Sequence, residues 1–201
     1  MKRIIAVLLA VMMILLAGCG KKADVPDEPI VSDEPVLGEI TDEVIIMEGF
    51  EEPVRYQKIS NIGGVASIKY DVDNFSYFYD AEDETVYIQA IGNEHCFMTV
   101  RCLREIGVSD RVDEIKTQLA DTDCVVTDNG DSIELIDGTV ASFFWCEHNP
   151  NQGEDSFMTC YYFVPYDSGC FEIMFTHPGT SEYAEGAGSR LVNMVRTFRF
   201  E

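Results

Sequence analysis

The sequence predicts one α+β domain at residues 55–201, in which an antiparallel β-sheet is flanked by two helices. The first observation is the alternation of apolar and polar residues along much of residues 66–175, which is typical of strands that bury one face. The second is a three-to-four-residue spacing of apolar positions in segments 109–120 and 178–195, which is typical of amphipathic helices. A chain of 201 residues has room for one such core plus extra segments, not for two full domains.

The first part of the domain contains four short alternating segments. They lie at residues 66–72, 75–79, 85–91 and 95–103. In the first, Ala66, Ile68 and Tyr70 alternate with polar residues, and Asp73 and Asn74 form a turn before the second. Consecutive strands joined by short turns predict a β-meander.

A helix is predicted at residues 109–120, after these strands. Ser109 is expected to cap its N-terminus, and Ile115 and Leu119 lie on one apolar stripe with Val112. Two short strands at 124–127 and 132–136 follow, separated by a turn that contains Asn129 and Gly130. Because Asn-Gly favours two-residue hairpin turns, these strands are expected to pair with each other.

Residues 140–146 and 157–164 are apolar at both alternating sets of positions, so both faces of these strands are expected to be covered. Residues 171–175 predict another strand, and residues 197–200 a short closing strand. The helix between them begins near residues 178–181 and carries one apolar stripe. The stripe consists of Tyr183, Ala187, Leu191, Met194 and Val195. Gly186 and Gly188 weaken this helix by about 1 kcal/mol each.

The N-terminus has the order of a secretory signal. Lys2 and Arg3 precede an apolar run at residues 4–16, which is too short for an ordinary transmembrane helix. The residues that follow, Leu16-Ala17-Gly18-Cys19, resemble the lipobox of bacterial lipoproteins. The resemblance implies a signal peptide at 1–18, acylation (such as palmitate) of Cys19, and a lipid anchor on the extracytoplasmic face of the cell membrane. The alternative is an uncleaved anchor with an incidental cysteine.

Residues 19–54 are expected to be the lipidated cysteine and an acidic, disordered tether. Residues 20–53 contain eleven acidic residues and four prolines but only two lysines. Such a composition buries too little apolar surface to offset the entropy of ordering the chain. As an alternative, the apolar run around Ile45 forms a strand that docks on the domain.

The order of elements in the folded part resembles the PsbP-like superfamily, named for the extrinsic P subunit of photosystem II. The resembling features are Tyr70-Asp71, Phe75-Ser76-Tyr77, the central helix from Ser109, Ile136-Asp137-Gly138 and the closing Arg196-Thr197-Phe198-Arg199-Phe200. The resemblance implies a PsbP-like sandwich. It implies no functional residue, because members of the superfamily do not share one activity.

Six cysteines remain after Cys19, and they permit three disulfides in an exported protein. They are Cys96, Cys102, Cys124, Cys146, Cys160 and Cys170. Cys96 and Cys102 cannot pair within one straight strand, because about 20 Å would separate them. Cys146 and Cys160 could face each other across a hairpin near Gly153. The alternative is that most are small buried apolar side chains. The absence of a Cys-x-x-Cys pattern argues against redox and structural zinc sites.

No catalytic, cofactor-binding or metal-binding residue is expected. His95, His148 and His177 are too dispersed for a histidine metal site. Cys146 and His148 suggest a thiol–imidazole pair, but neighbours two apart on a strand usually point in parallel. Acidic turns at 71–73, 80–84 and 128–131 lack the ligand pattern of a calcium loop and are expected to be solvated.

The charge excludes one class of partner. Fourteen Lys and Arg residues against 36 Asp and Glu residues give a formal charge of −22, so nucleic acid is not expected to bind. The preferred function is a non-enzymatic binding or scaffolding role in the cell envelope, through the membrane anchor and an envelope protein or glycan partner. The alternatives are a small-molecule or cation-binding receptor component of a transporter, and an envelope hydrolase with an unrecognised site.

Overall fold

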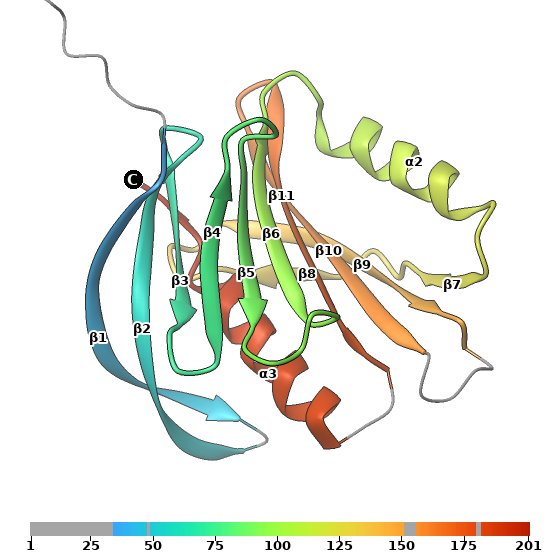
Figure 1. Ribbon diagram of the computed structural model, residues 1–201. Helices are drawn as coiled ribbons and strands as arrows, with labels where there is room; N and C mark the ends of the chain where they lie inside the picture. Colours follow the sequence, from blue (N-terminus) through green and yellow to red (C-terminus); the bar gives the residue numbers. More distant parts are fainter. Residues whose placement is uncertain (1–33, 48, 151–155, 180–181) are drawn as a thin grey trace, which may run out of the picture. The chain divides into compact units, whose positions relative to one another are not determined.

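The computed structural model describes residues 34–47, 49–150, 156–179 and 182–201, which form an α+β fold of two antiparallel sheets and two helices (Figure 1). The predicted signal peptide, Cys19 and residues 20–33 of the expected tether lie outside these residues. Within the described ranges, no helix has the length and apolar character needed to cross a membrane.

Sheet A has four strands. Along the sheet they are β1 (Val36–Met47), β2 (Phe50–Ile62), β3 (Ala66–Asp71) and β12 (Arg199–Phe200). The hairpin of β1 and β2 is long and curved, with register shifts in both the β1–β2 and β2–β3 ladders. The predicted closing strand at 197–200 is confirmed in part, because β12 pairs with β3 through its two residues.

Sheet B is larger and contains the remaining strands. Along the sheet they are β4 (Phe75–Asp80), β5 (Thr85–Ala90), β6 (Phe97–Leu103), β11 (Gly169–Pro178), β10 (Phe157–Tyr166), β9 (Val140–His148) and β7 (Cys124–Thr127), with β8 (Ser132–Glu134) also paired to β9. The predicted strands from residue 66 onward all form. Their side chains alternate between an inner face, which looks toward sheet A, and an outer face.

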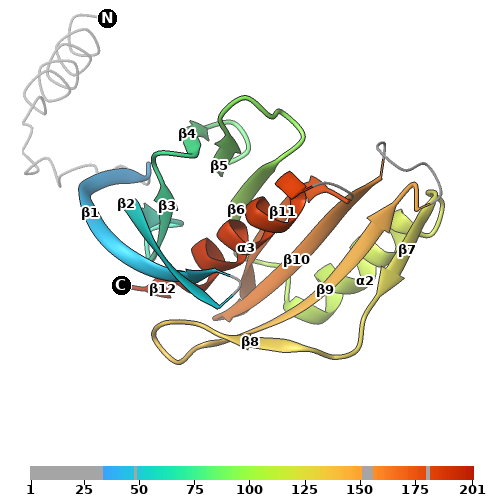
Figure 2. The same cartoon turned by 90° about the horizontal axis from the view of Figure 1, so that it is seen from below.

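Helix α3 (Glu182–Arg196) packs between the two sheets (Figure 2). Its predicted stripe is confirmed by Ala187, Leu191, Met194 and Val195, which are buried in the main core; the side chain of Tyr183 lies outside the described residues. The main core combines the inner face of sheet B with residues of sheet A such as Ile59, Ile62 and Ile68.

Helix α2 (Val108–Leu119) covers part of the outer face of sheet B. Ile115 and Leu119 pack there against Phe144 and Phe163, as the apolar spacing predicted. The cap prediction was wrong: the N-cap is Gly107, and no side chain caps the helix. Ser109 instead lies within the first turn.

The prediction of a disordered tether is wrong from residue 36 onward, because β1 and the start of β2 are strands of sheet A. Residue 55 is therefore not the start of the folded domain. The alternative of a docking strand around Ile45 describes this part of the chain. Met47 is buried, Ile45 packs against the core, and the Asn193 side chain of α3 donates to the carbonyl of Ile46 at 3.4 Å. These contacts with distant residues order a segment whose own composition favours disorder.

Two predictions of strand pairing were also wrong. The meander is limited to β4, β5 and β6, because β3 lies in sheet A while β4 lies in sheet B. The turn containing Asn129 and Gly130 does not close a hairpin. Instead β7 pairs with residues 145–148 of β9, and β8 pairs with residues 140–142 of the same strand. The two short strands therefore follow each other along one edge of sheet B.

The turn after β3 is not the solvated acidic turn that the sequence predicted. Asp71 is 1% exposed, and its carboxylate accepts hydrogen bonds from the Asn74 side chain at 2.8 Å and from the backbone amide of Asp73 at 3.1 Å. Arg190 of α3 donates to Asp71 at 2.9 Å and to Glu52 of β2 at 2.8 Å. This cluster connects α3 to two strands of sheet A.

We predict that Arg190→Met lowers the free energy of unfolding by about 3 kcal/mol, because it leaves the Asp71 carboxylate buried without its cation. Arg55→Met is the matched control. Arg55 pairs with Asp73 at 3.4 Å where both side chains are about half exposed, so its loss should cost at most about 1 kcal/mol. Urea unfolding measures both values, and equal losses would contradict the assignment of Asp71 as a buried anchor.

Helix α3 gives a second prediction. A Cβ atom at Gly186 would meet no atom within 4 Å, so Gly186→Ala should raise the free energy of unfolding by about 0.5–1 kcal/mol through backbone entropy. At Gly188 the Cβ atom would lie 3.2 Å from Nε2 of His177. Gly188→Ala should therefore raise the free energy of unfolding by less than Gly186→Ala does, or lower it. Thermal and urea unfolding of the two variants test this order, and the reverse order would refute it.

Candidate functional site

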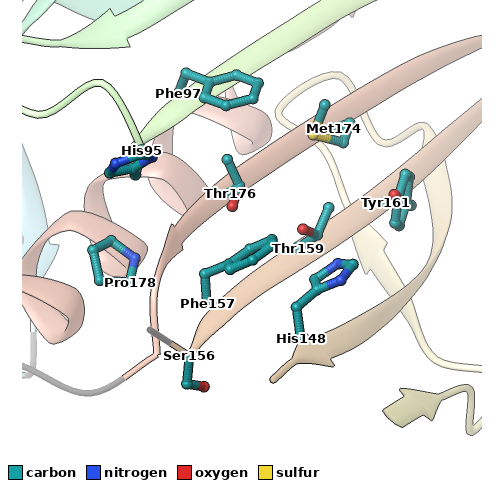
Figure 3. A pocket seen from close by; sticks show the side chains of 10 residues that line it. All are labelled: His95, Phe97, His148, Ser156, Phe157, Thr159, Tyr161, Met174, Thr176 and Pro178. Carbon is teal, nitrogen blue, oxygen red and sulfur yellow. The ribbon is translucent and has the colours of Figure 1, made fainter. Parts of the chain in front are cut away.

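A pocket of about 550 Å³ opens on the outer face of sheet B (Figure 3). It is lined from β6, β9, β10, β11 and adjoining residues by His95, Phe97, His148, Ser156, Phe157, Thr159, Tyr161, Met174, Thr176 and Pro178. Its volume falls within the range of about 300–1,000 Å³ that is usual for small-molecule sites. The alternation in the sequence predicted burial of both faces at 157–164, but this part of the outer face is hollowed.

The strand register arranges the lining residues in rows across the sheet. Thr159 of β10 pairs with Thr176 of β11, which pairs in turn with Phe97 of β6. On one side of this row Tyr161 pairs with Met174, and on the other Phe157 pairs with Pro178. A row of small threonines therefore lies between two rows of larger side chains.

One wall of the pocket is a stacked pair from neighbouring strands. The rings of His148 and Phe157 lie 4.2 Å apart between centroids and are inclined by only 10°. Burial lowers the pKa of His148 below its ordinary value, so the imidazole is neutral at pH 7. The wall is thus aromatic and uncharged.

The floor of the pocket contains an unsatisfied hydroxyl group. Thr176 is 6% exposed, and its Oγ1 atom has no hydrogen-bond partner in the part of the chain that the structure describes. A buried polar group without a partner costs about 1–3 kcal/mol. Such an atom at the base of a pocket indicates a place where a ligand can supply the missing partner.

No Lys or Arg side chain is among the described residues that line the pocket. Residues 151–155, outside the described ranges, contain none in their sequence. The carboxylate of Glu94 lies 3.8 Å from Nε2 of His95 on an exposed part of the rim. The electrostatic environment is therefore neutral to negative and offers an anion no positive partner.

The thiol–imidazole pair is closer than the sequence analysis expected. Sγ of Cys146 lies 3.1 Å from Nε2 of His148, so the two side chains do not simply point in parallel. Burial raises the pKa of the Cys146 thiol to about 12 and lowers that of His148, so both groups are neutral. A nucleophilic thiolate needs a lowered pKa and access to a substrate, whereas Cys146 is fully buried. The contact is a hydrogen bond between neutral groups.

All six cysteines of the described residues are free. The possible pairing of Cys146 with Cys160 was wrong by one residue of register, because Cys146 pairs with Thr159 and Cys160 with Trp145. The two thiols therefore lie on opposite faces of sheet B. Burial raises the pKa of Cys160 to about 12, and that of Cys96 and Cys170 to about 11, as for small apolar core residues.

The other acidic turns use their carboxylates locally. Asp80 accepts hydrogen bonds from the backbone amides of Glu82 and Asp83, and Asp128 accepts one from Gly130 and pairs with Lys116. Within the described ranges, no three His, Cys, Asp or Glu side chains are grouped so that they could hold a metal ion.

The sequence analysis missed the pocket, although its pattern held one sign of it. The alternation of side chains along residues 95–103 puts His95 and Phe97 on the face opposite Met98, which is the face that lines the pocket. The structure brings His95 and His148 to the same pocket, whereas His177 lies against Gly188 of α3. The missing information was the order of the strands in sheet B, which brings these residues together on a part of the outer face that α2 does not cover.

The buried imidazole predicts a pH dependence. Because burial lowers the pKa of His148, the unfolded chain binds a proton at higher pH than the folded chain does. The associated stability is complete above about pH 6.5 and is lost as the pH falls through the lowered pKa. His148→Phe should therefore lose less free energy of unfolding between pH 7.5 and 5.5 than the wild type, whereas the exposed His95→Phe should follow the wild type. Equal losses in all three proteins, measured by urea unfolding, would contradict this.

Comparisons with known proteins identify no family. No protein-family model matches the chain, and no curated protein matches it. The chain is similar to a crystal structure of a protein from Bacteroides thetaiotaomicron VPI-5482, with a TM-score of 0.44 and 12% sequence identity. The similarity covers 72% of this chain and 48% of that one, so the chain spans about half the length of that protein. At this level of similarity, neither a fold family nor a function is transferred.

Proposed function

We propose that the protein is a lipid-anchored, extracytoplasmic bacterial lipoprotein that binds a ligand of the cell envelope without catalysing a reaction. The observation that carries the proposal is the pocket on the outer face of sheet B. Its size suits a small molecule, its walls are apolar and aromatic, and the thiol beside it is neutral and buried. Those properties support binding rather than nucleophilic catalysis.

The anchor is proposed from the sequence. Cys19 follows the small residues of the lipobox-like segment, and the apolar run before it is too short for an ordinary membrane-spanning helix. A two-chain acyl anchor holds a protein stably on a membrane, and it does so even where anionic headgroups repel a strongly acidic protein, such as this chain with its 36 Asp and Glu residues.

We also propose that the folded domain is a PsbP-like sandwich. The support is the order of elements around Tyr70-Asp71, the central helix and the closing helix. The proposal concerns ancestry and fold, and it assigns no functional residue.

The anchor predicts that Cys19→Ala abolishes incorporation of labelled palmitate and moves the protein from the membrane fraction to the soluble fraction of the envelope. Cys102→Ala is the matched control and should keep both properties. Fractionation after metabolic labelling gives the result. Wild-type labelling of the Cys19 variant would refute the anchor.

The pocket predicts that the protein carries a small molecule when it is purified from its native membrane. Organic extraction followed by mass spectrometry should find a compound enriched with the wild type and lost with Met174→Trp, which fills the pocket. Phe78→Trp, at an exposed position of β4 on the same face, should retain the compound. Equal compound levels in both variants would refute the pocket as the binding site, provided that thermal melting shows both variants folded.

A further inference from the structure

We propose that the edge of sheet A at β1 binds an extended, basic segment of a partner protein, which adds a strand to the sheet. This surface lies on sheet A, whereas the pocket opens on sheet B, and the pocket's ligand plays no part in it. Figure 1 shows β1 at the outer edge of its sheet, beside β2. The length of this edge, its backbone groups and its charge all point to such a partner.

Among the described residues, β1 is the longest strand at an edge of either sheet. It has 12 residues, whereas β12 at the other edge of sheet A has two, and sheet B ends in the six-residue β4 and the four-residue β7. Natural edges are commonly protected by being short or by carrying Lys, Pro or a bulge. The register shift of β1 lies between Leu37 and Ile40, and the segment from Ile40 to Met47 contains no Lys or Pro.

The hydrogen bonds of β2 define which backbone groups of β1 point outward. The amide of Val72 donates to the carbonyl of Arg55 at 3.0 Å, so the backbone groups of Arg55 point toward β3. Successive residues of a strand point these groups to alternate sides, so those of Tyr56 point toward β1, where Thr41 is its partner. The residues that alternate with Thr41 along β1 therefore point their N–H and C=O groups away from β2.

These outward residues are Ile40, Asp42, Val44 and Ile46. The carbonyl of Ile46 accepts from the Asn193 side chain at 3.4 Å, which agrees with its outward direction. In the part of the chain that the structure describes, no strand pairs with β1 on this side. An added strand can therefore form a second ladder here without displacing any bond between β1 and β2.

The side chains of the outward residues lie together on one face of the sheet. Ile40, Val44 and Ile46 are 48%, 63% and 59% exposed, and Asp42 stands between the first two. Residues directly opposite in an added strand have their Cβ atoms about 4.5–5.5 Å away. Apolar residues opposite these three side chains would remove apolar surface from water, which favours association.

The charge of the edge selects a basic strand. Glu39 and Asp42 are exposed on β1, and Glu51 is exposed on β2. Within the described ranges, no Lys, Arg or His forms an ion pair with any of these three carboxylates. Opposite charges across a pair of strands stabilise it, and like charges destabilise it. A partner with Lys or Arg opposite Glu39 and Asp42 would supply the missing cations.

Two occupants from the chain itself fit this edge less well. A second copy of β1 would place acidic side chains against acidic side chains. Residues 20–33, which precede β1, contain four Asp and Glu residues against two Lys, and Pro26 and Pro29 supply no amide donors. A basic segment of another protein has neither disadvantage.

Two synthetic peptides test the charge preference. The first, acetyl-VTVTKTVK-amide, is designed to run antiparallel to β1. Its valines then lie opposite Ile40, Val44 and Ile46, and its lysines opposite Glu39 and Asp42. The second peptide has glutamate in place of both lysines. Binding is measured by calorimetric titration of the full chain in phosphatidylcholine nanodiscs, with empty nanodiscs as the blank. The lysine peptide is expected to bind about tenfold more tightly, because each change turns an attractive cross-strand pair into a repulsive one.

Methylation of the peptide amides tests strand pairing itself. The valines opposite Ile40 and Val44 would donate their amides to β1, whereas the threonines opposite Thr41 and Glu43 would point their amides away. N-methylation of those two valines should abolish binding of the lysine peptide, and N-methylation of the two threonines should preserve it. Equal effects of the two modifications would overturn strand addition.

Variants of the protein locate the binding edge. Val44→Pro removes one outward amide but no donor of the β1–β2 ladder, so it should abolish binding while the protein stays folded. Asp42→Lys should weaken binding of the lysine peptide and strengthen binding of the glutamate peptide. Asp121→Lys makes the same change of charge at an exposed residue after α2, and it should leave the preference of the wild type unchanged.

The outcomes decide between the possible occupants. If the two peptides bind equally or neither binds, the basic partner is overturned. If Asp42→Lys keeps the wild-type preference, the peptide binds elsewhere and the edge is overturned, whether or not Val44→Pro folds. If light scattering in detergent finds a wild-type dimer that Asp42→Lys changes, the occupant is a second copy. If replacing residues 23–33 by Gly and Ser strengthens binding of the lysine peptide, the occupant is that segment.

Discussion

Sheet B presents apolar side chains on both of its faces, and the rest of the molecule is arranged to cover them. Sheet A and α3 pack against the inner face, and the buried residues of all three form the main core. Among the described residues, α2 covers part of the outer face, where its Ile115 and Leu119 reach Phe144 and Phe163. Twelve residues of helix extend about 18 Å, which is shorter than the face they lie on. The pocket is the part of a two-sided sheet that its helix does not reach.

Buried carboxylates determine where each helix lies. Glu172 of β11 is 3% exposed and accepts from Arg101 of β6 at 2.6 Å and from Arg111 of α2 at 2.6 Å. Because a buried carboxylate is costly without its cations, α2 cannot slide along the sheet toward the pocket without taking Arg111 away from Glu172, which would then keep Arg101 alone. Asp71 holds α3 against sheet A in the same way, through Arg190. Both helices are thus fixed at their positions by one arginine each, in addition to apolar packing.

The sequence could predict the elements from residue 66 onward, because their periodicity reflects which face of each strand or helix is buried. It could not predict their partners. Cys146 and Cys160 are one residue out of register with each other, so they do not face across the hairpin. The residues Asn129-Gly130 favour a hairpin turn, but the two strands that flank them both pair with β9. The candidate site was missed for the same reason, since Thr176, Phe97 and Phe157 become neighbours only through the order of strands in sheet B.

Strand β1 shows why an acidic composition need not indicate a tether. It is an edge strand of sheet A, and Val36, Ile40, Val44 and Ile46 on it are exposed. An apolar edge with unpaired backbone groups is a template on which a second copy of the chain can add a strand and begin to aggregate. Glu39 and Asp42 are exposed on the same strand, so two such edges that approach each other bring like charges together. The acidic residues that resemble those of a disordered segment therefore keep a sheet edge soluble.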